Sequence, residues 1–314
     1  MRKTLLLLLA VFLVVGVFSS CGNAEADEFS AWYCFEDDRG EEIRLLEKPE
    51  NVAVLFSSLA DIWCLAGGAV EITVGESVER GFADASAVLA DSGAGKTVNT
   101  EVLLAAEPDF VICSFDIDAQ VKTADLLNKK GIPAACFRVD SFEDYLRVLK
   151  IFTDITGDSE AYALNGEAVA LRIASLLDGV EGKNGGNILF IRSGSGASSA
   201  KAKTADMHFA AAILEDIGTY NIAKNAPLLL DGLSIESVLK EDPKFIFISV
   251  MGNEEAARAH MESVLQAPAW QALSAVKNGR VFYLPRELFQ YKPNAKWDLA
   301  YEYLIGIVYE QEKE

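Results

Sequence analysis

The hydrophobic pattern repeats one helix-to-strand unit at two places in the chain. In residues 99–113 a polar start and a first-turn carboxylate, Glu101, precede an apolar stripe that ends at Pro108, and a continuous apolar run follows. Residues 234–248 have the same order, with Glu236 in the position of Glu101 and a proline at the same distance behind it. Polar caps, first-turn carboxylates and a terminating proline are typical of short helices, and unbroken apolar runs are typical of strands buried on both faces. The repeat therefore predicts two lobes built alike, each with a carboxylate at the N-terminus of a helix.

Short apolar runs alternate with amphipathic helical patterns in both halves of the chain. In the first half, after a hairpin pattern at 29–46, strands are predicted at 52–56, 72–74 and 133–137, and helices at 57–66, 118–130 and 142–156. In the second half, strands are predicted at 187–191 and 281–284, and helices at 206–217, 254–265 and 295–310. Strands that alternate with helices predict an α/β fold in which each lobe has a central, mainly parallel sheet flanked by helices.

A long helical pattern separates the two halves. Residues 159–177 contain no helix breaker except Gly166. At about 1.5 Å per residue this helix would be roughly 28 Å long, which is enough to cross from one lobe to the other. We therefore expect an N-terminal lobe at 29–157, an interlobe helix at 158–178 and a C-terminal lobe at 179–314. In parallel α/β sheets ligands bind beyond the carboxyl ends of the strands, so the cleft between the lobes is the expected site.

The N-terminal residues have the pattern of an export signal. A basic head precedes an apolar core at 5–18 that, at about 1.5 Å per residue, is too short for a hydrocarbon layer about 30 Å thick. We predict a signal peptide at 1–20. Small residues before Cys21 resemble the lipobox of bacterial lipoproteins, which implies that Cys21 is acylated and that residues 21–28 form a tether. The predicted location is extracytoplasmic, anchored to the cell membrane by a lipidated Cys21; a plain secretory signal is the alternative.

The composition is that of a globular protein. The chain has 314 residues, of which 51% are hydrophobic and 24% charged, so each of two lobes can bury its own core. A formal net charge of -19 argues against nucleic acid and against anionic lipid surfaces as partners. Four cysteines follow Cys21: Cys34, Cys64, Cys113 and Cys136. An oxidising compartment permits disulfides, but the apolar runs around the last three favour buried thiols, and no CxxC spacing predicts a metal site.

Two motifs suggest enzymatic chemistry, and each lacks its structural context. Residues 90–97 fit a relaxed phosphate-loop pattern, but no strong strand precedes them and no helix opens at their Gly-Lys-Thr. Ser193 replaces the first glycine of a nucleophile elbow, and only His208 and His260 are available as bases. Two histidines also argue against a site of several imidazoles for bare zinc or manganese. Met207 or His208 is a candidate axial ligand to haem iron, although both also suit the first turn of an ordinary helix.

Eight candidate ligand-binding residues follow from positions at the carboxyl ends of the predicted strands: Ser57, Ser58, Arg80, Phe115, Arg192, Met251, Arg286 and Tyr291. Lys203, as a further cation, and Met207 and His208, as candidate ligands to iron, complete the set. The four cations among these side chains stand out in so acidic a chain. Together they predict contact with an anionic chelate that carries carboxylate or phosphate groups, whereas each one alone also suits a surface charge.

Five stretches in combination resemble a known family, the substrate-binding proteins of ABC importers of the siderophore, haem and cobalamin type. They are residues 51–58, 99–109, 218–222, 234–243 and 275–282. The resemblance extends from about residue 29 to the C-terminus. It implies the class III type of periplasmic binding protein fold, with two lobes joined by one rigid helix and limited closure on the ligand. It also implies a monomer without enzymatic activity or a resident cofactor, whose ligand is a metal chelate.

The resemblance further implies that Glu101 and Glu236 dock onto arginines of the membrane permease. The chemistry of the two residues agrees with this role, because a first-turn carboxylate is stabilised by the helix dipole and can accept a bidentate guanidinium. A helix-cap carboxylate without a partner is the simpler reading of each residue. Two other functions remain open at this point, an exported α/β enzyme that uses the same cleft and a sensor or adhesion lipoprotein that transports nothing.

Overall fold

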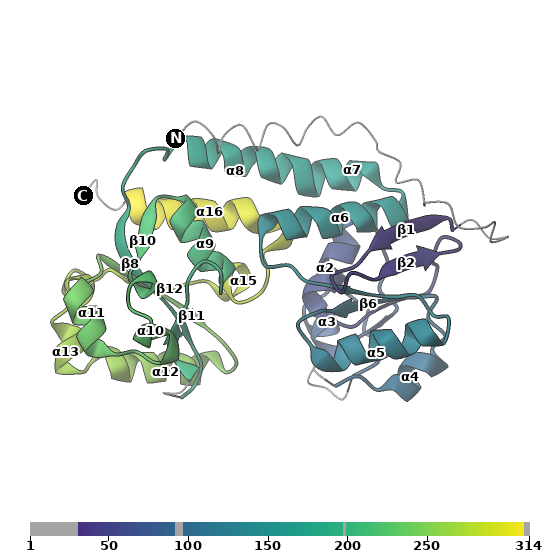
Figure 1. Ribbon diagram of the computed structural model, residues 1–314, viewed down its shortest axis with the longest axis horizontal. Coiled ribbons are helices and arrows are strands. Elements are labelled where there is room, and N and C mark those ends of the chain that lie inside the picture. The colour runs from purple at the N-terminus through teal and green to yellow at the C-terminus, as the bar shows by residue number, and fades with distance from the viewer. Residues whose placement is uncertain (1–30, 92–96, 197–198, 311–314) are drawn as a thin grey trace.

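The computed structural model describes residues 31–91, 97–196 and 199–310, and it consists of two α/β lobes that lie side by side (Figure 1). The predicted signal peptide, Cys21 and the tether lie outside the described residues, as does most of the phosphate-loop pattern. Within the described ranges, no helix is long and apolar enough to cross a membrane.

The N-terminal lobe has a parallel sheet with the strand order β5-β4-β3-β6-β7. Its strands are β3 (Val52–Val54), β4 (Ile72–Thr73), β5 (Val88–Leu89), β6 (Phe110–Ser114) and β7 (Ala134–Phe137). Its helices are α2 (Ser57–Leu65), α3 (Gly75–Glu79), α4 (Thr100–Ala105), α5 (Asp118–Lys129) and α6 (Phe142–Thr156). An antiparallel hairpin, β1 (Tyr33–Glu36) and β2 (Glu42–Leu45), packs beside this sheet. Because both faces of the sheet are covered, β3, β6 and β7 are buried along their whole length.

The C-terminal lobe has a second parallel sheet with the order β10-β8-β11-β12, and β9 pairs antiparallel with β8. Its strands are β8 (Gly186–Ser193), β9 (Lys201–Ala202), β10 (Thr219–Asn221), β11 (Phe245–Val250) and β12 (Val281–Tyr283). The helical elements that precede β12 are α9 (Phe209–Asp216), η4 (Ile222–Lys224), α10 (Leu228–Asp231), α11 (Ile235–Glu241), α12 (Glu254–Leu265), α13 (Pro268–Gln271) and α14 (Ser274–Lys277). Those that follow β12 are α15 (Arg286–Phe289), η5 (Asn294–Lys296), α16 (Trp297–Ile305) and η6 (Gly306–Glu310).

A continuous helical segment joins the lobes along one side of the molecule (Figure 1). It consists of α7 (Ser159–Tyr162), a π-helical turn η2 (Ala163–Glu167) and α8 (Ala168–Asp178). Gly166 lies in the π-helical turn and is buried, and a Cβ there would come within 3.2 Å of Leu146 and 3.3 Å of Leu149 on α6. The Asn165 side chain donates to the Leu65 carbonyl at 2.8 Å, which ties the same turn to α2. The first half of the interlobe helix is therefore fixed to the N-terminal lobe.

One apolar core continues from lobe to lobe beneath this helix. It includes Phe152 of α6, Val169 of α8, Phe209 of α9 and Trp297 of α16. Trp297 lies against Phe209 with ring centroids 5.3 Å apart and against Phe142 of the other lobe at 6.1 Å. Because packed cores resist deformation, this shared core favours limited hinge motion over wide opening of the lobes.

The predicted fold class is confirmed, and so are the repeated helix-to-strand units, now α4–β6 and α11–β11. The helix predicted at 206–217 begins later than expected, at Phe209, because His208 is its N-cap and accepts a hydrogen bond from the Ala210 amide. The final helix predicted at 295–310 is present but divided into 3-10, α and π-helical parts. The π-helical turn within the interlobe helix was not predicted.

Candidate functional site

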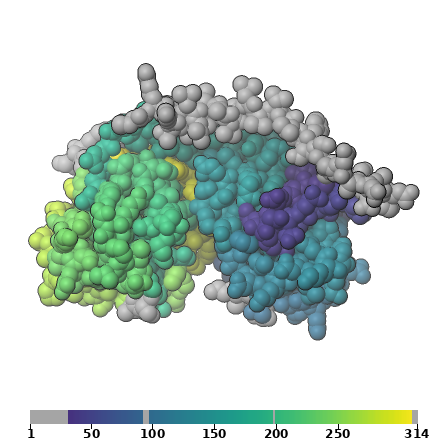
Figure 2. Space-filling view, viewed as in Figure 1, coloured from purple at the N-terminus to yellow at the C-terminus, as the bar shows by residue number. Residues whose placement is uncertain are grey.

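A notch separates the lobes on the side away from α8, as Figure 2 shows in the same view as Figure 1. In the N-terminal lobe, Ser57 begins the helix after β3, Arg80 follows α3, and Phe115 follows β6. In the C-terminal lobe, Arg192 lies near the end of β8, and Arg286 begins α15 after β12. Parallel strands thus bring these separate segments to one cleft, as expected for open α/β sheets.

Arg80 is held at the cleft by neutral hydroxyl groups. Its Nη1 donates to Ser57 Oγ at 2.8 Å and approaches Ser58 Oγ at 3.5 Å. Ser57 Oγ in turn donates to Glu76 Oε2 at 2.6 Å. Both serines are buried, so they orient the guanidinium more than they contact solvent. The remaining N–H donors of Arg80 have no hydrogen-bond partner among the described residues, which leaves them available to a ligand.

Tyr291 brings two arginines from opposite lobes to one ring. The guanidinium carbon of Arg80 lies 4.0 Å from the ring centroid, and that of Arg286 lies 5.2 Å from it. Cation–π contacts of this kind hold planar guanidinium groups without neutralising them. Nε of Arg286 is buried and has no hydrogen-bond partner in the described part of the chain. The structure therefore assembles Ser57, Ser58, Arg80, Arg286 and Tyr291 into one interlobe cluster.

A second contact between the lobes comes from Asn294. Its Nδ2 donates to the Ser58 carbonyl at 3.0 Å and to Asp61 Oδ2 at 2.7 Å. Asn294 is fully buried and has a left-handed backbone with φ of 50°. Burial raises the pKa of Asp61, while the bond from Asn294 and the charge of Arg80 act in the opposite direction. This contact fixes α2 of one lobe to the segment before α16 of the other.

An ion pair also crosses the cleft. Lys292 Nζ lies 2.9 Å from Asp140 Oδ1, and its ammonium lies 5.4 Å from the ring centroid of Phe209. Asp140 is also 3.7 Å from Arg138, whose guanidinium carbon lies 4.5 Å from the ring of Phe115. Phe115 is thus covered by a cation of its own lobe, a contact that its position after β6 did not reveal.

A group of cations surrounds His208 in the C-terminal lobe. Burial, together with the charges of Arg192, Lys292 and Lys203, lowers the pKa of His208 to about 3. Its ring lies between those of Phe190 and Phe209, at centroid distances of 4.9 and 4.8 Å. With Nδ1 accepting from the Ala210 amide, His208 has a structural role as a neutral helix cap, which differs from the first-turn position expected for it.

The other candidates lie around this group. Arg192 pairs in register with Ser249 of β11, and burial lowers its pKa below the ordinary value. Met251 is half-buried beside the loop after β8, where a Cβ on Gly194 would lie 3.3 Å from its methyl carbon. Met207 is exposed and precedes the capping histidine. The structure therefore gives Met207 and His208 different surroundings, although they are adjacent in sequence.

Glu101 and Glu236 occupy equivalent positions in the two lobes. Each is the second residue of its helix, α4 or α11, and each side chain is exposed. Asn99 caps α4 by accepting from the Val102 amide at 3.2 Å. Both helices lie in the part of the molecule away from the interlobe helix, one on each lobe (Figure 1). The two carboxylates are exposed, one on each lobe.

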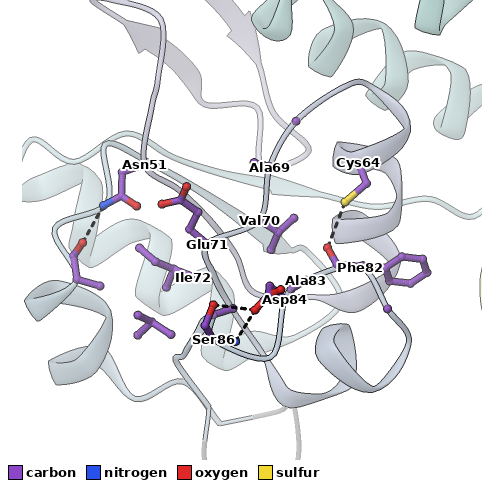
Figure 3. Close-up of a pocket in the computed structure, with 15 residues that line it drawn as sticks. Asn51, Cys64, Ala69, Val70, Glu71, Ile72, Phe82, Ala83, Asp84 and Ser86 are labelled. Atoms are coloured by element: carbon purple, nitrogen blue, oxygen red, sulfur yellow. Dashed lines mark hydrogen bonds between the residues drawn. The ribbon is translucent and has the colours of Figure 1, made fainter.

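A cavity of about 920 Å³ lies within the N-terminal lobe and not in the interlobe cleft. It is at the amino end of the sheet, where Asn51 and Glu71 precede β3 and β4 (Figure 3). Asp84 accepts hydrogen bonds there from the amide and hydroxyl of Ser86. Cys64 donates to the Phe82 carbonyl at 3.2 Å, and burial raises the pKa of its thiol to about 11. In the described ranges, no group of three or more His, Cys, Asp or Glu side chains could hold a metal ion.

The comparisons with known proteins agree with this architecture. Residues 52–288 match the family model described as periplasmic binding protein, and no curated protein sequence matches the chain. An ABC transporter substrate-binding protein from Listeria monocytogenes is 17% identical and superposes with a TM-score of 0.68, covering 84% of this chain and 100% of the other. For the siderophore binding protein BauB, bound to ferric iron and two acinetobactin molecules, the identity is 15%, the TM-score 0.68 and the coverage 87% and 96%.

A third similar structure is IsdE of S. aureus complexed with heme, which is 14% identical, with a TM-score of 0.66 and coverage of 83% of this chain and 99% of the other. At these identities the superpositions establish the shared fold and nothing finer. The family model, in contrast, matches most of the chain, from the first strand of the N-terminal sheet to α15. The chain therefore belongs to the periplasmic binding protein family.

Proposed function

We propose that this protein is the extracytoplasmic substrate-binding component of an ABC importer. In this role it captures an iron–siderophore, haem or corrinoid-type metal complex between its lobes and delivers it unchanged to the membrane permease. The observation that carries the proposal is the interlobe cluster, in which Arg80 of one lobe and Arg286 of the other meet at Tyr291. Proteins of the same fold bind a ferric siderophore complex and heme.

The proposed binding surface consists of side chains at the carboxyl ends of both sheets. It includes Ser57, Ser58, Arg80, Phe115, Arg192, Lys203, Met251, Arg286 and Tyr291, with Met207 and His208 at its border. Cationic and aromatic groups predominate, which suits a chelate that combines anionic oxygen atoms with flat organic rings. Arg138 and Lys292, which both form ion pairs with Asp140, extend the same surface.

Transfer to the permease is proposed to depend on Glu101 and Glu236. Each exposed carboxylate is held at the start of a helix, where the dipole stabilises its charge. Guanidinium groups of a permease would bind such carboxylates in a bidentate manner. One contact on each lobe would let the permease distinguish a closed, loaded protein from an open one.

The proposal includes a lipid anchor at Cys21, a monomeric state and the absence of catalytic activity. The lipobox-like segment supports the anchor, since a tethered receptor stays near its permease. The membership in a family of binding proteins supports a role in capture and delivery.

Fluorescence titration of the purified protein with ferric siderophores, haem and cobalamin tests the proposal, together with uptake by cells that lack the gene. Trp297 lies in the core between the lobes and should report binding by quenching. We expect saturable quenching by at least one complex, and loss of uptake of that same complex in the deletion strain. Chemical conversion of a bound ligand by the purified protein, or normal uptake without the gene, would contradict the proposal.

A further inference from the structure

Two cysteines lie side by side in the sheet of the N-terminal lobe. Cys113 of β6 and Cys136 of β7 are direct partners in the register of these parallel strands. Both side chains are fully buried, and both belong to the apolar cluster that includes Ala124 and Leu127 of α5. The two thiols therefore occupy the same face of the sheet, in one small space from which solvent is excluded.

The geometry of this pair meets the requirements of a disulfide bond. Neighbouring strands lie about 4.8 Å apart, and a disulfide needs Cα atoms roughly 4.4–6.8 Å apart with side chains that converge. The side chains do converge, because a hydrogen bond joins the thiols of Cys113 and Cys136. Oxidation of the two thiols therefore requires little movement of the backbone.

The outer edge of β7 is covered by the turn of the β1–β2 hairpin. β7 is the last strand of its sheet, so Cys136 can be approached from that edge only where the turn is absent. The Asp38 amide donates to the Cys136 carbonyl at 3.0 Å, and the Cys136 amide donates to Asp37 Oδ2 at 2.8 Å. Arg39 Nη2 donates to the Ala134 carbonyl at 2.7 Å. The pair is thus open to reagents while the chain folds and shielded once the turn is in place.

The exchange chemistry available outside the cytoplasm suits this order of events. The chain belongs to a family of periplasmic proteins, and thiols in that compartment meet disulfide oxidants. One cysteine thiolate attacks the oxidant's disulfide and releases one thiol, and the second cysteine then attacks the mixed disulfide and releases the other. The chain gains one S–S bond, and the oxidant takes two electrons and two protons as two thiols. The hydrogen bond with Cys136 and burial raise the pKa of the Cys113 thiol, so a thiolate forms more readily before the core closes.

We infer that Cys113 and Cys136 form an intrachain disulfide in the exported protein, made by exchange with a protein disulfide or with oxidised glutathione. The bond closes the loop of residues 113–136 and so restricts the unfolded chain. It also lies close to the cleft. Cys113 is two residues before Phe115 and Cys136 two residues before Arg138, whose guanidinium carbon is 4.5 Å from the Phe115 ring. The cross-link holds together the two strand ends that carry this contact.

Peptide mapping of the full chain, exported to the periplasm of an expression host that contains a protein disulfide oxidant, tests the inference. The sample is quenched with acid, and its free thiols are alkylated in denaturant before digestion with trypsin. Cleavage after Lys and Arg places Cys113 in peptide 97–122 and Cys136 in peptide 131–138, and it separates both from Cys34 and Cys64. A second portion is reduced with dithiothreitol before alkylation. The variants are Cys113→Ala and Cys136→Ala, with Cys64→Ala as the matched control.

We expect most of the unreduced wild-type protein to give peptides 97–122 and 131–138 as one joined species, two hydrogen atoms lighter than their sum. The reduced portion should give the two peptides separately. Cys64→Ala should keep the link, whereas Cys113→Ala should leave Cys136 open to alkylation without reduction, and Cys136→Ala should do the same for Cys113.

If most of the unreduced wild-type protein gives the two peptides separate and alkylated, the inference is wrong. A link from either cysteine to Cys34 or Cys64 also overturns it. Because the decisive map is that of the wild-type chain, a variant that fails to fold does not affect the result. Neither contrary outcome bears on ligand capture, which titration and uptake measure separately.

Discussion

Glu107 and Asp242 adopt the same left-handed backbone conformation, with φ of 50° and 38°, at equivalent points in the two lobes. Each residue immediately precedes the proline between its helix and the following strand. In both lobes the residue after that proline donates its amide to an asparagine carbonyl, Asn51 at 3.0 Å and Asn187 at 2.8 Å. The lobes therefore share backbone geometry at single residues, which extends the likeness beyond the order of elements.

Replacement of these two residues by glycine should have opposite effects. Glu107→Gly relieves a strained backbone conformation at the cost of an exposed side chain only. It should raise the free energy of unfolding by about 0.5 kcal/mol. Asp242→Gly should lose about 1 kcal/mol, because its carboxylate accepts from the Ser274 amide at 2.8 Å and from its hydroxyl. Urea unfolding measures both values. An equal loss in both variants would contradict this explanation.

Loss of the Asn294 side chain should destabilise the contact between the lobes. Asn294→Gly keeps the left-handed backbone but removes the donor to Ser58 and Asp61, and we expect a loss of about 2 kcal/mol. Asn294→Ala should cost about 1 kcal/mol more, since alanine is strained at this φ. The two unfolding free energies separate the side-chain effect from the backbone effect. A glycine variant as stable as wild type would exclude this contact as a significant link.

His208 should make the protein less stable as the pH falls below about 6.5. Its folded pKa is about 3, against an ordinary value of 6.5, so between these values only the unfolded state takes up the proton. Stability due to neutral His208 is complete above pH 6.5 and should fall by about 2 kcal/mol at pH 5.

The variant His208→Asn keeps a side chain that can cap α9 but does not titrate, so its unfolding free energy should change less between pH 7 and pH 5. His260→Asn, which replaces the half-buried histidine on α12, serves as the matched control. Equal slopes in all three proteins would show that burial of His208 does not cause the effect.

Local sequence patterns predicted most of the fold. Apolar runs of period and length typical of buried strands located β3, β6, β8 and β11, and glycine or proline marked where the adjoining helices end. The π-helical turn at residues 163–167 escaped prediction because its cause is tertiary. Gly166 packs against α6, and Asn165 bonds to the end of α2, and neither contact has a local signal.

The candidate site likewise contains residues that local patterns predicted and residues that only tertiary contacts reveal. The rule that ligands lie at strand ends singled out Arg80, Arg286 and Tyr291, which the structure brings together from segments distant in sequence. Asn294 and Lys292 were missed, since a polar residue that bridges two lobes is indistinguishable in sequence from one exposed to solvent. The sequence shows only that an asparagine, a residue that adopts the left-handed backbone more readily than most, follows Pro293.

Transport by cells that carry Glu101→Ala with Glu236→Ala tests most directly whether two like lobes present carboxylates to a permease while a metal complex lies between them. A control protein with Glu143→Ala and Glu255→Ala removes exposed first-turn carboxylates from other helices of the same two lobes. The measurement is uptake of a radiolabelled metal complex, alongside the affinity of each purified protein for it. We predict that the first double variant abolishes uptake and keeps wild-type affinity, while the control transports normally. Weaker binding by the first variant with unchanged uptake per bound complex would contradict the account.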